Sequence, residues 1–267
     1  MNEAQKIIKV FAICLAIVII FNIFTAIISV FTSIFDLDFD TREKKEFNQV
    51  YENIKKIKIE SVTANITIKE GDSFEVLATN MKSKFSCNVE NEILKIEEHN
   101  KIFFNNSGGN IVVYVPFNTK LDELDIENSA GKIKIENILA KKIDLDQGAG
   151  KIEIEGSKFD KADIDGGAGK IEISSSVLND LDFDAGVGEI SLNGSITGNS
   201  KIDCGVGSIN MYLENSKDEY SIIASKGLGS IKIDGINKDS DTTYGTGENK
   251  IKLEGGVGSI NVNFSNI

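Results

Sequence analysis

The chain has 267 residues, with 41 acidic side chains against 29 basic ones and a formal net charge of −12. An acidic surface of this kind repels nucleic acid, so we expect no nucleic-acid partner. Three scattered cysteines exclude a disulfide framework or a paired-cysteine metal site, and they leave open whether Cys87 and Cys204 are free.

The N-terminal part of the chain predicts a membrane anchor. Residues 10–35 carry no charge and are rich in Ile, Phe and Val, and about 20 apolar residues span a bilayer. No small-residue cleavage site follows, so a signal anchor fits better than a cleaved signal peptide. Basic residues at Lys6 and Lys9 place residues 1–9 in the cytoplasm and the remainder outside it. We expect a single-pass protein of the cell membrane, with a charged juxtamembrane linker at residues 36–55.

A seven-residue phrase recurs along residues 56–267, the predicted main domain. It reads GAGKIEI at 148–154 and again at 167–173, and five of its seven copies follow one another at steps of 19 residues. The last two copies, at 227–233 and 256–262, follow longer insertions. A constant period predicts stacked supersecondary units. The key glycines of the series are Gly131, Gly150, Gly169, Gly188, Gly207, Gly229 and Gly258.

Each unit is predicted to contain two short strands. In one unit, Ile133 and Ile135 alternate with polar residues, and Ile143 and Leu145 repeat that alternation farther along. This period of two is typical of half-buried strands. The glycines permit positive φ and a close approach of neighbouring backbones. Because stacking in register requires a fixed unit length, we predict an all-β fold. It is a β-solenoid of two-strand rungs after one N-terminal transmembrane helix, in preference to an antiparallel meander.

The longer insertions are predicted to bulge from one edge of the stack. Residues 237–249 would form such a loop, and the rung near 257–264 would be the exposed last one. An open terminal rung invites edge-to-edge pairing. The sequence leaves open whether the chain itself or a partner caps this rung.

Aspartates recur at one position of the unit and are the best candidate for a ligand site. The column contains Asp146, Asp165, Asp184 and Asp203. Carboxylates on strands about 4.8 Å apart repel by about 0.9 kcal/mol in water. Lys151 and Lys170 follow Asp146 and Asp165 by five residues across the glycine corner, so we expect these lysines to offset the repulsion.

The compensation by lysine lapses farther along the column. Weak calcium binding is therefore one hypothesis for Asp182, Asp184, Glu189 and Asp203, although the period differs from that of calcium-binding β-rolls. The plainer interpretation is a set of exposed carboxylates that accept hydrogen bonds from corner amides. Identical melting with calcium and with chelator would exclude the calcium site.

No catalytic constellation is evident in the sequence. His99 is the only histidine and lies in the polar stretch EEHNK. Acid–base catalysis needs paired groups with differently tuned pKa values in a pocket. The repeats also contain no arginine to hold a sugar carboxylate, so a polysaccharide-acting enzyme is only a remote alternative. We predict that the chain is not an enzyme and needs no cofactor.

Two segments resemble a known family. They are KIKIESVTANITIKEGDSFEVLA at 56–78 and NIVVYVPFNTKLDELDIENSAGKIKIE at 110–136. An opening strand pair, an extended VYVP strand and glycine-punctuated rungs resemble the bacterial "putative adhesin" domain of unknown function, a β-strand-repeat family. The resemblance covers residues 56–267 and implies a β-solenoid that is often membrane-anchored in Gram-positive bacteria. Some relatives are linked to envelope stress, and the family implies no catalytic residues.

These observations lead to one functional expectation and one alternative. We expect a membrane-anchored extracytoplasmic domain that binds or scaffolds an envelope protein or a cell-wall polymer, in the manner of an adhesin. The alternative is an envelope-stress sensor that signals through a membrane partner. The sequence names neither the ligand nor the oligomeric state, and it does not give the handedness of the solenoid.

Overall fold

The structure is a computed structural model that describes residues 45–81, 84–99 and 108–265. The predicted membrane span at 10–35 and the cytoplasmic segment at 1–9 lie outside these residues. Within the described ranges, no helix combines the length and apolar character needed to cross a membrane. The described residues form one compact unit.

The repeats form a β-solenoid, as predicted. Equivalent residues of successive units are direct partners in parallel strands, so that Ile152 pairs with Ile171 and Ile171 pairs with Ile190. This in-register parallel pairing excludes the meander for the repeats. The five strands that stack in sequence order are β8 (Lys120–Glu136), β9 (Leu139–Glu155), β10 (Lys158–Asn179), β11 (Leu181–Thr197) and β12 (Asn199–Leu213).

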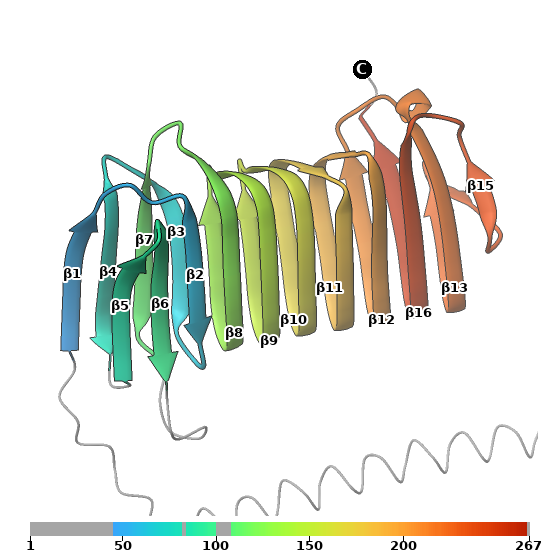
Figure 1. Ribbon diagram of the computed structural model, residues 1–267. Helices are drawn as coiled ribbons and strands as arrows, with labels where there is room; N and C mark the ends of the chain where they lie inside the picture. The colour runs from blue at the N-terminus through green and yellow to red at the C-terminus, as the bar shows by residue number, and fades with distance from the viewer. Residues whose placement is uncertain (1–44, 82–83, 100–107, 266–267) are drawn as a thin grey trace, which may run out of the picture. The chain divides into compact units, whose positions relative to one another are not determined.

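Each unit is one long strand that bends at its glycine corner, whereas the sequence predicted two separate short strands. β9 keeps its register with β10 on both sides of the corner. Figure 1 shows the long strands doubling back, so that their two halves enclose a common core. In β9 the inward side chains Ile143, Leu145, Ile152 and Ile154 are all buried. Burying one such side chain contributes about 1.5–3 kcal/mol. Each of the other stacked strands buries a similar group of inward side chains.

The stacking order departs from the sequence order at the C-terminal end. β16 (Asn249–Phe264) lies between β12 and β13 (Tyr220–Ile233) and is parallel to both (Figure 1). The prediction that the rung near 257–264 is the exposed last one is therefore wrong. A strand placed between two rungs pairs along both of its edges, which satisfies more backbone groups than an end position does.

The insertion at 237–249 also differs from the expected loop. β14 (Ile236–Asn237) and β15 (Thr242–Tyr244) pair antiparallel with β13, on the edge that β16 leaves free. The short helix η1 (Lys217–Glu219) lies in the connection from β12 to β13. The chain thus covers the two ends of its own C-terminal edge, and short, irregular edge strands of this kind discourage pairing with other chains.

The N-terminal end is closed by a mixture of parallel and antiparallel strands. β2 (Lys56–Ser61) and β3 (Asn65–Gly71) form the first rung and pair with the two halves of β8. β6 (Ile93–His99) pairs in parallel with β2, and β7 (Asn110–Pro116) pairs in parallel with β3. The outer strands β4 (Phe74–Met81) and β5 (Lys84–Glu90) are antiparallel to β7 and β6.

Part of the predicted linker at residues 36–55 is a strand. β1 (Lys45–Tyr51) pairs antiparallel with β4, so the linker prediction is wrong for this segment. Phe47 and Tyr51 pack against the core, and the ring centroid of Phe47 lies 5.2 Å from that of Phe85. These aromatic contacts explain why a highly charged segment is ordered against the sheet.

Candidate functional site

The glycine corners determine how closely the rungs stack. All seven key glycines have φ between +130° and +154°, a conformation that other residues rarely adopt. A Cβ on Gly169 would lie 1.8 Å from the carbonyl oxygen of Gly150 on the preceding rung. The close approach of the rungs therefore depends on glycine at these positions.

Outward carboxylates form a column directly before the corners. Eight neighbouring strands contribute to it in register, with Glu97, Glu60, Glu127, Asp146, Asp165, Asp184, Asp203 and Glu254. At about 4.8 Å per strand the column is about 34 Å long. A second outward column contains Asp125, Asp144, Asp163 and Asp182. We define the acidic face as the central part of both columns: Asp125, Glu127, Asp144, Asp146, Asp163, Asp165, Asp182 and Asp184.

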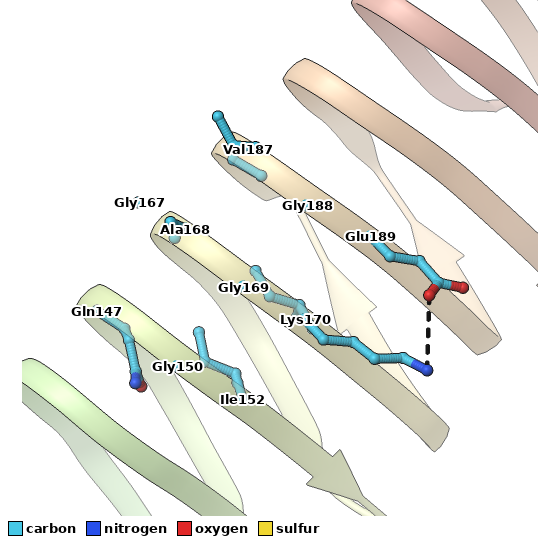
Figure 2. A pocket seen from close by; sticks show the side chains of 13 residues that line it. Gln147, Gly150, Ile152, Gly167, Ala168, Gly169, Lys170, Val187, Gly188 and Glu189 are labelled. Carbon is cyan, nitrogen blue, oxygen red and sulfur yellow. Dashed lines mark ion pairs between the residues drawn. The ribbon is translucent and has the colours of Figure 1, made fainter. Parts of the chain in front are cut away.

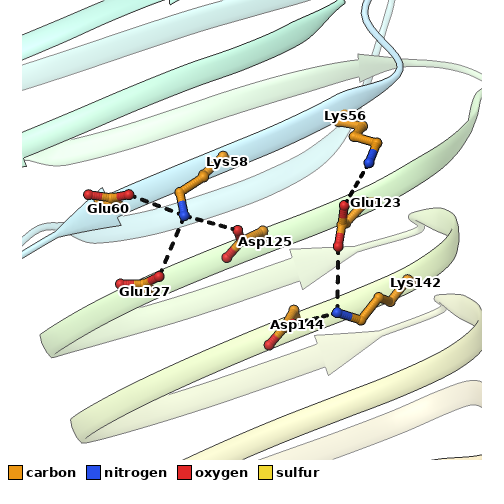
Figure 3. Close-up of polar contacts among 8 residues, drawn as sticks. All are labelled: Lys56, Lys58, Glu60, Glu123, Asp125, Glu127, Lys142 and Asp144. Atoms are coloured by element: carbon orange, nitrogen blue, oxygen red, sulfur yellow. Dashed lines mark hydrogen bonds and ion pairs between the residues drawn. The ribbon is translucent and has the colours of Figure 1, made fainter.

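Lysines neutralise the acidic face at its N-terminal end. Figure 3 shows the Nζ atom of Lys58 among three carboxylates, at 3.2 Å from Glu60, 3.3 Å from Asp125 and 3.6 Å from Glu127. The hydrogen bond to Glu60 is the main cause that raises the pKa of Lys58. One strand farther, Lys142 contacts Asp144 at 2.5 Å.

The centre of the acidic face, at Asp163 and Asp165, has no such compensation. Among the described residues, no lysine lies within 4 Å of either carboxylate, whereas Asp182 lies opposite Lys201 on the next strand, and the two charges attract each other. Burial, followed by the charges of Asp163 and Asp184, raises the pKa of Asp165 above its usual value of 3.8. Asp146 and Asp165 are exposed, as the plainer interpretation of the column expects. Within the described part of the chain, however, neither carboxylate accepts a hydrogen bond from a corner amide. The expected hydrogen bonds to the corner are therefore wrong for these two residues.

Lys151 and Lys170 do not offset the aspartates, contrary to expectation. The corner turns the chain to the other side of the core, where these lysines meet glutamates. The ion pairs there are Lys132–Glu153 at 2.6 Å, Lys151–Glu153 at 2.6 Å, Lys151–Glu172 at 2.5 Å, Lys170–Glu172 at 2.7 Å and Lys170–Glu189 at 3.6 Å. We call these six residues the paired face. Hydrogen bonds from Lys151 and Lys170 lower the pKa of Glu172 to about 2.

The four residues considered for calcium do not converge. Asp182, Asp184 and Asp203 lie before the corners, whereas Glu189 lies beyond its corner and faces Lys170 (Figure 2). In the described part of the chain, no three side chains of the His, Cys, Asp or Glu type are grouped so that they could hold a metal ion. His99 is exposed, and its Nε2 lies 3.7 Å from Glu97.

An inward polar column, which the repeat pattern did not single out, runs beside the acidic column. Its members Glu98, Ser61, Asn128 and Gln147 are in-register partners and are buried. The same alternation that places Leu94 and Ile96 in the core also places Glu98 there, so the sequence did contain a signal for it. Among the described residues, one side-chain oxygen each of Glu98, Asn128 and Gln147 has no hydrogen-bond partner.

The surroundings of these unpaired oxygens differ. Gln147 donates from Nε2 to the carbonyl oxygens of Gly131 and Ala149, at 2.7 and 2.9 Å, and it lines a cavity of about 10 Å³ (Figure 2). A cavity of this size has room for about one water molecule. Glu98 and Asn128 instead line a pocket of about 350 Å³ at the corner between β2 and β3.

Two comparisons find similar proteins. The family model described as "Toastrack DUF4097" matches residues 54–263. Similar crystal structures include a "putative cell adhesion protein" from Clostridium sporogenes, with 19% identity and a TM-score of 0.39, covering 84% of this chain and 100% of that chain. A "putative lipid binding protein" from Parabacteroides distasonis has 17% identity and a TM-score of 0.41, covering 83% and 97%.

A third crystal structure, a "putative adhesin" from Bacteroides fragilis, has 12% identity and a TM-score of 0.38, covering 84% of this chain and 98% of that one. No curated protein matches the chain. The family model covers both the glycine-punctuated rungs and the opening rung of β2 and β3. The chain belongs to the Toastrack DUF4097 family.

Proposed function

We propose that the chain is a non-catalytic binding module of the cell envelope, whose acidic face recognises a basic surface of an envelope protein. The single observation that carries this proposal is the centre of the acidic face, where no lysine among the described residues pairs with Asp163 or Asp165. Like charges at strand spacing destabilise the fold, and a cationic partner would relieve that repulsion.

The shape of the surface beside the aspartates supports the same proposal. A groove of about 360 Å³ follows the glycine corners, and Asp146, Asp165 and Asp184 lie along it. Four glycines line much of the groove between the carboxylates, so a partner chain can approach the backbone closely there: Gly148, Gly166, Gly167 and Gly186. Charge complementarity over such a surface speeds association and fixes orientation more than it raises affinity.

The localisation belongs to the same proposal. Residues 10–35 would anchor the chain in the cell membrane, with residues 1–9 in the cytoplasm and the solenoid outside. The uncharged span and the nearby lysines support this orientation. Protease added to intact cells should digest the solenoid but leave residues 1–9 protected, and full protection of the solenoid would refute the orientation.

Two matched triple variants of the full-length chain test the role of the acidic face. One replaces Asp163, Asp165 and Asp182 by Asn, and the other replaces Glu153, Glu172 and Glu189 on the paired face by Gln. Both change the net charge by +3. Each variant is used to capture envelope proteins at about 0.15 M salt, where exposed charges are screened beyond about 8 Å.

We expect the wild type and the paired-face variant to retain the same basic envelope protein and the acidic-face variant to lose it. Higher salt should weaken the retained complex. Equal capture by both variants would contradict the proposal. Circular dichroism of each variant checks that the solenoid is folded. An envelope-stress sensor remains the alternative function, and a captured membrane protein with a cytoplasmic signalling domain would favour it.

A further inference from the structure

An apolar ridge runs along the glycine corners in the later half of the solenoid. Four residues form it, each directly before a key glycine and each the in-register neighbour of the next: Val187 on β11, Val206 on β12, Val257 on β16 and Leu228 on β13. They are 55%, 48%, 48% and 71% exposed, in that order. Isolated apolar residues are common on protein surfaces, whereas contiguous ones are typical of interaction sites.

The corner conformation does not require these large apolar side chains. Ala149 and Ala168 occupy the same position on earlier rungs and keep the same register, and Figure 2 shows Ala168 on the corner next to that of Val187. A small side chain therefore suffices to close a corner. Half-exposed valines also contribute little to folding, because their outer surface stays in water. The ridge therefore points to an interaction outside the fold.

The ridge continues a surface that carries uncompensated negative charge. The groove beside the acidic face ends at Ala185 and Gly186, directly before Val187. Asp146 and Asp165 lie along this groove, and among the described residues neither of them has an ion pair. A ligand that lies along the corners would therefore meet the aspartates first and the ridge next.

Along the ridge itself the charges are balanced. Lys201 contacts Asp203 on β12 at 2.5 Å, and Lys252 contacts Glu254 on β16 at 2.6 Å. On β13 the in-register partner of Glu254 is Ser225, which carries no charge. The line of corners thus has an acidic part on β9 and β10 and a nearly neutral, apolar part from β11 through β12 and β16 to β13.

The charges decide which occupant fits both parts. A second copy of this chain has the same net charge of −12 and would bring its own acidic face against the first. A bilayer that contains anionic lipids would be repelled in the same way. A protein segment with basic residues next to apolar ones matches the acidic part and the apolar part together.

The geometry of the ridge favours a helical segment. Successive corners pair with each other in register, so the ridge offers side chains and not a free strand edge. A segment that lies on it must satisfy its own backbone groups, as a helix does. At about 4.8 Å per strand the ridge is about 14 Å long, which is nearly three helical turns of about 5.4 Å. Apolar residues at positions i, i+4, i+7 and i+11 would lie along it.

We propose that the ridge receives a cationic amphipathic helix, whose apolar side chains cover the ridge and whose basic side chains reach Asp146 and Asp165. This contact rests on the proposed function, because the helix belongs to the same basic envelope protein. Burial of the ridge supplies affinity. The aspartates speed association and set the direction of the helix along the corners.

A single tryptophan can report on the ridge, because the chain contains no tryptophan of its own. Val206→Trp places the reporter on the ridge, and Val50→Trp is the control, at a valine of β1 that is 56% exposed. Both full-length variants are reconstituted in vesicles of neutral phosphatidylcholine. The probe is an alanine-based helical peptide of about 18 residues, with four leucines on one face and three lysines beyond them at one end. A control peptide has the same composition, with the leucines scattered around the helix.

We expect the peptide with the leucine face to shift the emission of Val206→Trp to shorter wavelength and to leave Val50→Trp unchanged. The control peptide should bind more weakly by at least about tenfold. An equal shift at both positions, or equal binding of both peptides, would overturn the proposal. Quenching of Val206→Trp by brominated phosphatidylcholine without peptide would overturn it in favour of a lipid contact.

Two matched double variants measure what the ridge contributes. Val187→Thr with Val257→Thr changes the ridge, and Val50→Thr with Val89→Thr makes the same change at exposed residues elsewhere. Threonine keeps the branched shape of valine, which suits a strand, so both variants should fold. We expect the ridge variant to weaken the peptide by at least about fivefold and the control variant by less than about twofold. Equal losses in both would refute the proposal.

Asp146→Asn with Asp165→Asn separates the two parts of the surface. We expect this variant to weaken the peptide at about 0.05 M salt and to match the wild type at about 0.5 M, whereas the loss in the ridge variant should persist at both. If the aspartate variant weakens binding and the ridge variant does not, only the ridge fails and the proposed function stands. If crosslinking in the vesicles traps a wild-type dimer that the ridge variant lacks, a second copy occupies the ridge and the proposal is wrong.

Discussion

The Nζ atom of Lys151 lies 2.5 Å from Oε2 of Glu172, its neighbour on the next rung of the solenoid. Lys170 contacts the same glutamate from its own rung at 2.7 Å, so ion pairs continue from one rung to the next along the paired face. The acidic face has no equivalent at its centre, where Asp163 and Asp165 stand without lysines among the described residues. One repeat thus produces a compensated surface and an uncompensated one.

Replacing Glu172 by Gln should destabilise the fold at neutral pH. The pKa of Glu172 is lowered from 4.5 to about 2, so its carboxylate contributes stability that is fully present above pH 4.5. That contribution is lost as the pH falls from 4.5 towards 2. The difference in urea midpoint between wild type and variant should therefore be largest at pH 7 and shrink towards pH 2.

A control for Glu172→Gln is Glu248→Gln, which removes an exposed carboxylate with no ion pair in the described part of the chain. We expect little change in its urea midpoint at either pH. If the difference in urea midpoint between wild type and Glu172→Gln is the same at pH 7 and at pH 2, the ion pairs of Glu172 do not stabilise the fold.

Replacing Asp165 by Asn should stabilise the fold at neutral pH. The pKa of Asp165 is raised above 3.8, so its charged form is disfavoured in the folded state, and the penalty is fully present above the folded pKa. Removing it should gain roughly 0.2–1 kcal/mol, in the range measured for exposed charge interactions. The gain should vanish below pH 3.8, and urea denaturation at several pH values measures it.

Asp144→Asn is the matched control for this prediction, because Asp144 is paired with Lys142 at 2.5 Å. We expect no gain in stability there. If Asp165→Asn is destabilising at pH 7, the aspartate column is held by attractive contacts, and the argument for a cationic partner loses its basis.

Gly169→Ala should be strongly destabilising. Its φ of +147° is unfavourable for alanine by about 1–3 kcal/mol, and the added Cβ would lie 1.8 Å from the carbonyl oxygen of Gly150. Gly235→Ala is the control, with φ of +73° and no atom within 4 Å of the added Cβ. Urea midpoints of the two variants should differ clearly, and equal losses would show that the rungs are not packed as described.

Amide hydrogen exchange should reveal the inserted C-terminal strand. β16 pairs on one edge with β12 and on the other with β13, whereas β15 pairs only with β13. Peptides from residues 251–262 should therefore exchange at least about tenfold more slowly than those from residues 242–244. Fast exchange in β16, of the kind expected for an end rung, would contradict its position in the stack.

The sequence by itself determined the period, the type of structure and the inward residues of the rungs. Ile152 and Ile171 stand 19 residues apart and face the core as partners, because a strand alternates strictly and equal units stack in register. The seven key glycines were recognisable for the same reason, since only glycine tolerates the corner conformation repeatedly.

The tertiary structure alone decided which charges meet and in which order the rungs stack. Lys151 is five residues from Asp146 in the chain, but the corner carries it across the core to Glu153 and Glu172. The period identifies β13 and β16 as rungs without ordering them, because any rung can pair in register with any other. The pocket at Glu98 likewise exists only where β6, β2 and β8 lie side by side, since its acceptors come from strands far apart in sequence.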